Sequence, residues 1–287
     1  MSGPRPGISI EDAARRAFAE TSDPASYVSR PATDRVLDQL QEWSQRDDRG
    51  STVAAIVGTP GLGKTMLLRV AESLWREGSS EPAGVLYLPY GGLEPEDLVN
   101  WIYGLLGRTR ASPQGQAGFE EVDGGGFAGL AALRGGRARP FFLLVDDADS
   151  LKPATLQALA RDLPVEAASV RLVLALNPDS KATRLLAALA ALEPLEIPFR
   201  DRMSAEETEA YLRGRMRHVG FPEAEVARVN AQEARRIHAL SAGIPRAVHP
   251  VAAALFERLP SQAEEALRAK AHRENWMGRP MEEGTDV

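Results

Sequence analysis

Five short apolar segments alternate with stretches of helical periodicity in the first two hundred residues of the chain. Within the helical stretches, apolar residues recur every three or four positions, which is the spacing of an amphipathic α-helix. The segment at 141–145 is apolar throughout, as expected of a strand covered on both faces of a parallel sheet. Strands that alternate with helices predict a doubly wound α/β fold with right-handed crossovers. The predicted strands span residues 52–57, 85–88, 141–145, 170–176 and 195–199.

The last predicted strand contains Pro198, which has no N–H for a sheet ladder, so we expect this strand at an edge. No strand pattern follows it. A capping box at Ser204-Ala205-Glu206-Glu207 opens a helix to His218, and further helices are expected over roughly 223–241, 244–258 and 261–273. The glycine-rich stretch 107–139 predicts a mobile connection or, alternatively, a partner-contacting loop. The expected organisation is an N-terminal extension (1–26), an α/β domain (27–200), a small all-helical domain (201–274) and a flexible tail (275–287).

Between the first predicted strand and its helix lies Gly58-Thr59-Pro60-Gly61-Leu62-Gly63-Lys64-Thr65, which fits the phosphate-binding pattern G-x-x-x-x-G-K-[ST]. Strand, glycine loop and helix in this order direct several backbone N–H groups and the positive end of a helix at one point. We expect Lys64 to reach the β- and γ-phosphates of a nucleotide and the Thr65 hydroxyl to hold Mg²⁺. The alternative, a chance glycine-rich turn, is disfavoured by the strand and helix on either side.

Polar residues also follow two later strands. Asp146 and Asp147 end the 141–145 strand, where Asp146 is expected to orient the waters of the magnesium ion and Asp147 to polarise the attacking water. Asn177 ends the next strand and can bridge that water and the γ-phosphate, although on spacing alone a simple Asn-Pro turn is an equally good interpretation. Arg246 stands on the first turn of a predicted helix, from which it can reach the γ-phosphate.

Taken together, these motifs resemble those of the AAA+ ATPases, in the order Walker A, Walker B, sensor 1 and sensor 2. The similarity covers about residues 27–258 and is nearest to the ExeA-type ATPases of the general secretion pathway and their initiator-like relatives; residues 203–212 and 237–246 also carry it. It implies a P-loop NTPase sheet of order 5-1-4-3-2 with a helical lid. It implies adenine contacts from Tyr27 and Val28, catalytic roles for Lys64, Asp147, Asn177 and Arg246, and Mg²⁺ at Thr65 and Asp146. The nucleotide-binding set that it implies is Tyr27, Val28, Gly58, Thr59, Pro60, Gly61, Leu62, Gly63, Lys64, Thr65, Met66 and Arg246.

The chain departs from the pattern of this family at two places. Asp147 stands where relatives usually carry glutamate, and its shorter carboxylate predicts slow hydrolysis. The stretch 189–194, where the family places its trans-acting arginine, contains no arginine; Arg184, Arg200 and Arg202 are the available substitutes. Because such an arginine contributes about 10³–10⁵ in rate, its absence favours a nucleotide switch over a fast motor.

Composition limits the partners. The net charge is −6, no cysteine is present, and no run of 18 apolar residues occurs, so we expect a cytoplasmic protein without a membrane span. The expected ligands are ATP or ADP with Mg²⁺, and the expected partners are further copies of the chain in a ring or filament and an unidentified protein. Residues 200–279 contain 14 Lys and Arg against 11 Asp and Glu. That small excess leaves open an alternative, a DNA-associated regulator similar to the TniB/TnsC transposition ATPases. A signalling NTPase of the STAND kind is a third possibility, but the chain shows no repeat domains.

Overall fold

The computed structural model describes residues 10–46, 51–77, 84–109, 127, 140–163 and 170–256. Predictions for most of the 107–139 loop, for the 261–273 helix and for the tail lie outside these residues. The chain divides into two compact units. In the described ranges, one unit comprises residues 21–202 with 244–246, and the other comprises residues 10–20, 203–243 and 247–256. The predicted domain boundaries at residues 26, 200 and 274 stay predictions.

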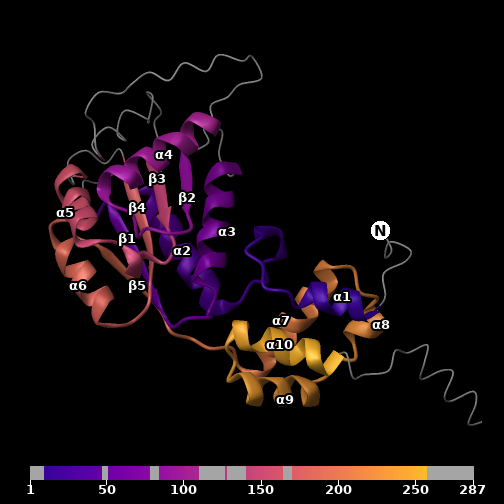
Figure 1. The fold of residues 1–287 in the computed structure, drawn as a ribbon. Helices are drawn as coiled ribbons and strands as arrows, with labels where there is room; N and C mark the ends of the chain where they lie inside the picture. Colours follow the sequence, from indigo (N-terminus) through magenta and orange to yellow (C-terminus); the bar gives the residue numbers. More distant parts are fainter. Residues whose placement is uncertain are drawn as a thin grey trace, which may run out of the picture. The chain divides into compact units, whose positions relative to one another are not determined.

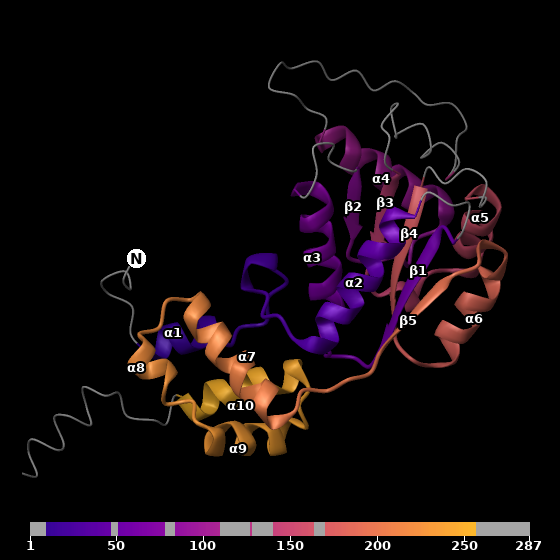
Figure 2. The ribbon, with the colours of Figure 1, turned by 180° about the vertical axis from the view of Figure 1, so that it is seen from behind.

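The first unit is built on a five-stranded parallel sheet of order β2-β3-β4-β1-β5 (Figure 1). This is the predicted order 5-1-4-3-2 read from the opposite edge, so the predicted fold class is confirmed. Strand β5, which carries Pro198, lies at the edge beside β1 (Figure 2). The strands are β1 (Val53–Gly58), β2 (Val85–Leu88), β3 (Phe141–Val145), β4 (Val170–Leu176) and β5 (Leu195–Phe199).

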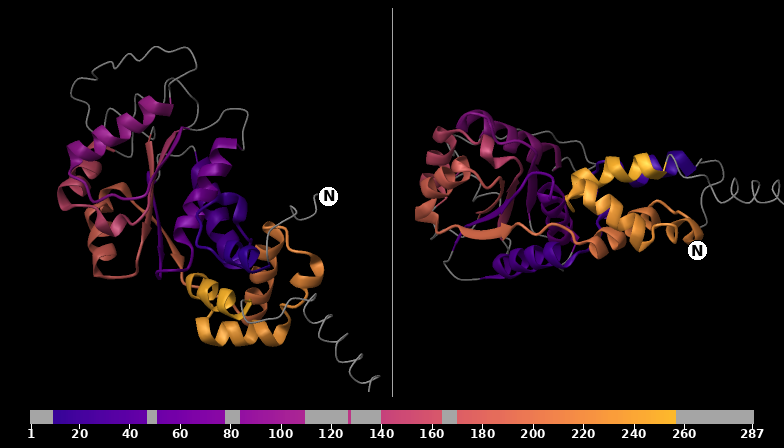
Figure 3. Two further views of the ribbon diagram at one scale, coloured as in Figure 1. Left: turned by 45° about the vertical axis from the view of Figure 1, so that its right-hand side comes forward. Right: turned by 90° about the horizontal axis from the view of Figure 1, so that it is seen from below.

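Helices cover both faces of this sheet, which Figure 3 (left) shows nearly edge-on. Successive side chains of a strand point to opposite faces, so Ala54 and Ile56 pack toward α2 and α3, whereas Val53 and Ala55 pack toward α4, α5 and α6. Each face of the sheet therefore packs on its own cluster of buried apolar side chains. The helices are α2 (Pro31–Gln45), α3 (Lys64–Glu77), α4 (Pro95–Thr109), α5 (Pro153–Asp162) and α6 (Ser180–Ala188), with 3₁₀ turns η1 (Pro24–Ser26), η3 (Ala148–Ser150) and η5 (Ala190–Leu192).

The second unit is helical in all of its described elements. The predicted capping box is present, because Ser204 Oγ accepts from the N–H of Glu207 at 3.1 Å and Glu207 Oε2 accepts from the N–H of Ser204 at 2.8 Å. The single helix predicted over 223–241 is wrong: Asn230 accepts from two backbone N–H groups and starts a new helix there. The helices are α1 (Ile10–Ala17), α7 (Ala205–His218), α8 (Glu223–Val226), α9 (Ala231–Ser241) and α10 (Pro245–Phe256).

Helix α1 belongs to this unit, a placement that the sequence analysis did not predict. The buried Arg215 of α7 donates from Nε to the carbonyl of Ala17 at 2.8 Å and from Nη2 to that of Ala19 at 3.0 Å. The Phe18 ring stacks on Phe256 with 5.3 Å between centroids. A cation at the carboxyl end of a helix is electrostatically favourable, so Arg215 anchors α1 on α7. None of the helices in the described ranges combines the length and apolarity that crossing a membrane requires.

Candidate functional site

The glycine loop connects β1 to α3, as predicted, and its backbone geometry favours glycine for two reasons, a positive φ and a close approach to another strand. Gly63 has φ +108°, a conformation that L side chains rarely adopt, and a Cβ built there meets no atom within 4 Å. A Cβ on Gly58 would lie 2.4 Å from the carbonyl oxygen of Phe199. Leu62 is fully buried and anchors the loop, and Arg30 Nη2 donates to the Leu62 carbonyl at 3.3 Å. The buried Leu62 and its bond to Arg30 therefore fix one side of the loop, whereas the space next to Gly63 is open.

Lys64 is the first residue of α3. Its ammonium donates to the carbonyl oxygens of Gly58 at 2.6 Å and Thr59 at 3.3 Å, and to Asn177 Oδ1 at 2.9 Å. Burial lowers the pKa of Lys64, and the carboxylates of Asp149, Asp146 and Asp147 act in the opposite direction. The structure therefore brings the loop lysine and the amide that follows β4 into direct contact, although they are 113 positions apart.

Asp146 and Thr65, the two predicted metal ligands, are joined by a hydrogen bond of 2.6 Å from Thr65 Oγ1 to Asp146 Oδ2. The same oxygen accepts from the Tyr87 hydroxyl at 2.9 Å, and Asp146 Oδ1 accepts from the N–H of Asp147 at 3.0 Å. Within the described ranges, no three His, Cys, Asp or Glu side chains gather as a ready metal cage. A hydroxyl and one carboxylate suit Mg²⁺, because this ion keeps several waters and binds one or two carboxylates together with substrate phosphates.

Asp149 completes this network, and the sequence analysis missed it. Its Oδ2 accepts from the N–H of Asn177 at 2.9 Å and from Asn177 Nδ2 at 2.7 Å, so it fixes the amide that faces Lys64. Burial raises the pKa of Asp149. The available signal was a third acid one turn after β3, in the run from Asp146 to Asp149.

Asp147 lies beside Asp146, as its position in the sequence requires, but its backbone is left-handed with φ 45° and ψ 44°. The following turn η3 starts at Ala148, and the Asp147 side chain does not cap it. The residue is exposed. Its carboxylate is therefore accessible to solvent.

The backbone of Arg246 contacts the glycine loop. Its N–H donates to the Gly61 carbonyl at 3.2 Å, and a Cβ on Gly61 would lie 3.0 Å from that of Arg246. Arg246 is in the first turn of α10, as predicted. Its positive charge contributes to the lowered pKa of Lys64, after burial.

The predicted adenine contacts, Tyr27 and Val28, follow η1, which contacts α3. The Tyr27 hydroxyl donates to Asp34 Oδ1 at 2.9 Å and lies 2.7 Å from the hydroxyl oxygen of Thr33, and burial raises the pKa of Tyr27 to about 12. Both residues are half-buried. Of the other predicted positions, Thr59 and Pro60 lie in the loop and Met66 in the first turn of α3.

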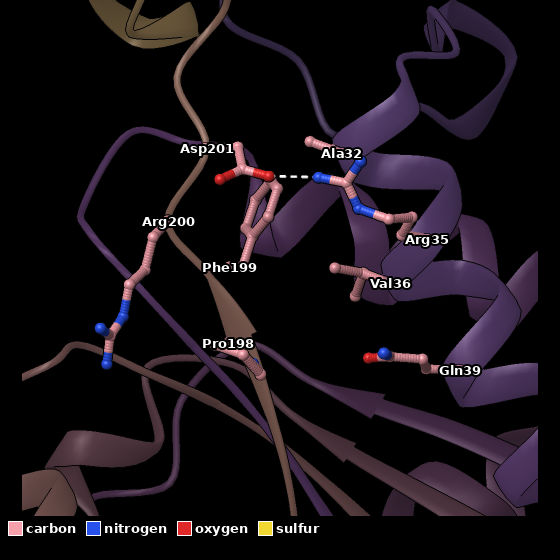
Figure 4. A pocket seen from close by; sticks show the side chains of 8 residues that line it. All are labelled: Ala32, Arg35, Val36, Gln39, Pro198, Phe199, Arg200 and Asp201. Atoms are coloured by element: carbon pink, nitrogen blue, oxygen red, sulfur yellow. Dashed lines mark hydrogen bonds and ion pairs between the residues drawn. The ribbon is translucent and has the colours of Figure 1, made fainter.

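The candidates for a trans-acting arginine, Arg184, Arg200 and Arg202, are all exposed. Arg200 lines a pocket of about 500 Å³ between α2 and the end of β5, in which Arg35 pairs with Asp201 (Figure 4). Figure 4 shows the Arg200 side chain pointing away from that pair. None of the residues that line the pocket belongs to the predicted nucleotide-binding set, so this pocket is separate from the glycine loop.

Comparisons with known proteins agree with the fold of the α/β unit. Residues 45–186 match the family model described as AAA domain. No curated protein matches significantly. Among solved structures, the chain is similar to Drosophila ORC bound to DNA (22% identity, TM-score 0.56, covering 90% of this chain and 64% of that one). It is also similar to Cdc6p from Pyrobaculum aerophilum (20%, 0.51, 79% and 65%) and to Aeropyrum pernix ORC1 in complex with DNA (16%, 0.53, 93% and 72%). The chain therefore spans somewhat less than two thirds of the first two, and at these identities the similarity shows the fold alone.

Proposed function

We propose that the chain is an AAA+ ATPase that binds MgATP at the glycine loop, hydrolyses it slowly and acts as a nucleotide-dependent switch that assembles with further copies of itself. The match of residues 45–186 to the AAA domain model supports this premise. The observation that carries the proposal is the hydrogen bond between Thr65 and Asp146, 81 positions apart, at the start of the helix that follows the loop. A hydroxyl beside a carboxylate at this point is a ligand pair that suits a magnesium nucleotide, and this supports the proposal.

Each part of the site has a role in this proposal. The first N–H groups of α3 lack intrahelical acceptors and, with the loop N–H groups, suit the phosphate oxygens of ATP. Lys64 exchanges at least one of its three present acceptors for those oxygens, and Arg246 contributes a second positive charge. Bound Mg²⁺ supplies neutralisation of the phosphate charge. Thr65 and Asp146 would hold this ion.

Hydrolysis is assigned to the residues at the ends of β3 and β4. Asp147 accepts a proton from the attacking water, and Asn177 orients that water through its amide, which Asp149 fixes. Asp147 is one methylene shorter than glutamate and lies in solvent, so we expect low turnover. We further propose that the protein acts in the cytoplasm on an unidentified protein partner.

The test measures nucleotide binding and assembly in the same samples. Lys64→Ala is expected to abolish binding of a fluorescent ATP analogue and the ATP-dependent increase in mass measured by light scattering. Lys152→Ala is the matched control, because Lys152 is a partly exposed lysine of the same unit that pairs with Glu94, away from the glycine loop. Asp147→Asn is expected to keep binding and lose turnover. Unaltered binding and assembly in Lys64→Ala would refute the proposal.

A second candidate function is DNA-associated regulation of the TniB/TnsC kind. Two similar structures, the Drosophila and Aeropyrum pernix proteins, were solved with DNA, and Arg235 and Arg236 of α9 are both exposed here. Contacts to phosphates make binding fall steeply with salt. Retention on duplex DNA with ATP at 50 mM salt, lost at higher salt and in Arg235→Ala/Arg236→Ala, would support it. No retention at low salt would dismiss it.

A further inference from the structure

Tyr87 contacts the proposed magnesium site without having a role in it so far. It is the third residue of β2, and its backbone is paired with Leu144 of β3, two residues before Asp146. Its side chain reaches past the end of β3, and its hydroxyl donates to Asp146 Oδ2 at 2.9 Å. The oxygen that accepts from Thr65 thus has a second donor, which comes from a different strand.

The hydrogen bonds account for most of the accepting capacity of this carboxylate. An ionised carboxylate offers about four lone-pair positions, two on each oxygen. Thr65 and Tyr87 take the two on Oδ2, and the N–H of Asp147 takes one on Oδ1. The remaining position, on Oδ1, is the one available to the hydration shell of a cation. Because the Thr65 hydroxyl proton is directed at Asp146, the lone pairs of Thr65 Oγ1 are also available to a cation.

The Tyr87 ring is itself held by side chains of α3. The Arg69 guanidinium lies 4.5 Å from the centre of the Tyr87 ring, a cation–π contact. Glu72 pairs with Arg69 at 2.6 Å and with Arg76 at 2.8 Å, and Arg76 donates to the Val85 carbonyl at 2.9 Å. Because these contacts hold the ring, the Tyr87 hydroxyl is kept in position to donate to Asp146.

We propose that Tyr87 is a positioning residue for the magnesium site, which holds the Asp146 carboxylate in the orientation that keeps Thr65 Oγ1 and Asp146 Oδ1 facing the cation. The inference rests on the proposed function. Without the hydroxyl, Oδ2 retains only Thr65 and the carboxylate rotates more freely about its Cβ–Cγ bond. Magnesium affinity is then lower, whereas the phosphate contacts of the loop are unaffected.

The experiment compares Tyr87→Phe with Tyr103→Phe. Both replacements remove one phenolic hydroxyl from the α/β unit, but the buried Tyr103 hydroxyl has no hydrogen-bond partner among the described residues. Binding of a fluorescent ATP analogue is titrated with Mg²⁺ and repeated in EDTA. For Tyr87→Phe we expect the half-saturating Mg²⁺ concentration to rise about tenfold, the usual effect of losing one hydrogen bond to a charged group, with binding in EDTA unchanged. Tyr103→Phe is expected to titrate as the wild type.

Different results separate the inference from the proposed function. If the wild type binds the analogue and Tyr87→Phe has the same magnesium titration, the inference is wrong and the proposed function stands. A Tyr87→Phe protein that loses binding equally in EDTA and in Mg²⁺ also overturns it, because the hydroxyl would then support the fold rather than the cation. A wild type that binds no nucleotide rejects the proposed function itself. Arg69→Met, which removes the guanidinium over the ring, is a second variant, expected to shift the Mg²⁺ titration in the same direction by a smaller factor; an unchanged titration counts against the inference.

Discussion

Replacement of Gly63 by alanine is the most direct test of where the phosphates bind. Gly63 has φ +108° and Gly220, after α7 in the helical unit, has φ +84°, and a Cβ at either position meets no atom within 4 Å. The two substitutions therefore introduce the same methyl group into open space at a backbone angle that disfavours it. They differ in location: Gly63 belongs to the proposed phosphate-binding loop, whereas Gly220 has no part in that site.

The expected magnitudes follow from this comparison. A non-glycine residue held at such angles costs about 1–3 kcal/mol, and no steric term is added at either site. A domain that is stable by about 5–15 kcal/mol remains folded after such a loss. Gly63→Ala should in addition obstruct the phosphates and turn loop N–H groups away from them, so we expect nucleotide affinity to fall at least about 100-fold, which corresponds to about 2.7 kcal/mol. Gly220→Ala should bind nucleotide as the wild type does.

Urea unfolding followed by circular dichroism gives the two stability losses, and titration with a fluorescent ATP analogue gives the two affinities. Both measurements are made under conditions in which both variants are folded. If Gly63→Ala binds the analogue as tightly as Gly220→Ala, the open side of the loop is not the phosphate site. If Gly63→Ala loses several kcal/mol more stability than Gly220→Ala, the absence of a steric term at Gly63 is refuted.

Three further predictions concern the helical unit. Burial, assisted by the charge of Arg215, lowers the pKa of His249 from 6.5 to about 4, so the unfolded chain takes up a proton that the folded chain refuses. The free energy of unfolding should thus fall by about 3 kcal/mol as the pH drops from about 6.5 to about 4, and His249→Gln should remove most of that slope. Gly243→Ala should cost about 3 kcal/mol in urea unfolding, because φ is +68° and the new Cβ would lie 2.2 Å from the Met203 carbonyl oxygen; a loss below 1 kcal/mol would contradict the reported contact. Arg215→Met should cost about 1–3 kcal/mol and make α1 the first site of limited proteolysis, since the buried carbonyl of Ala17 and the more exposed carbonyl of Ala19 both lose their donor; unchanged proteolysis would show that α1 is held by other contacts.

The sequence was sufficient for the α/β sheet because every strand in it has a local signal. The 141–145 strand is apolar throughout since both of its faces are covered, and the glycine loop identifies β1 by its position. Pro198 marks an edge strand because it has no N–H to donate. Each of these signals comes from residues close together in the chain, so the sequence alone reveals it.

The parts that the sequence did not give depend on pairs far apart in the chain. Nothing near Arg215 indicates that its guanidinium binds the end of α1, 196 and 198 positions away. Nothing in the local sequence distinguishes Tyr87 from other half-buried strand residues. Its hydrogen bond to Asp146 arises only because β2 lies next to β3. The break between α8 and α9 is different, because Asn230 is a local capping signal that the longer helical pattern concealed.

The strand order also explains why the polar residues of this site depend on one another. Since β4 lies between β1 and β3, the amide of Asn177 has Lys64 on one side and Asp149 on the other, and it donates to the acid while it accepts from the lysine. All three donated bonds of the Lys64 ammonium go to acceptors of the chain itself. An anion that takes this ammonium must replace at least one of them, and the only one made by a side chain is that of Asn177. Asp149 accepts from both the backbone N–H and the side-chain amide of Asn177, so the Asn177 side chain does not rotate freely. A change in the position of the Lys64 ammonium therefore acts on the end of β4. The contact between Lys64 and Asn177 therefore physically links occupation of the loop to the residue expected to orient the attacking water.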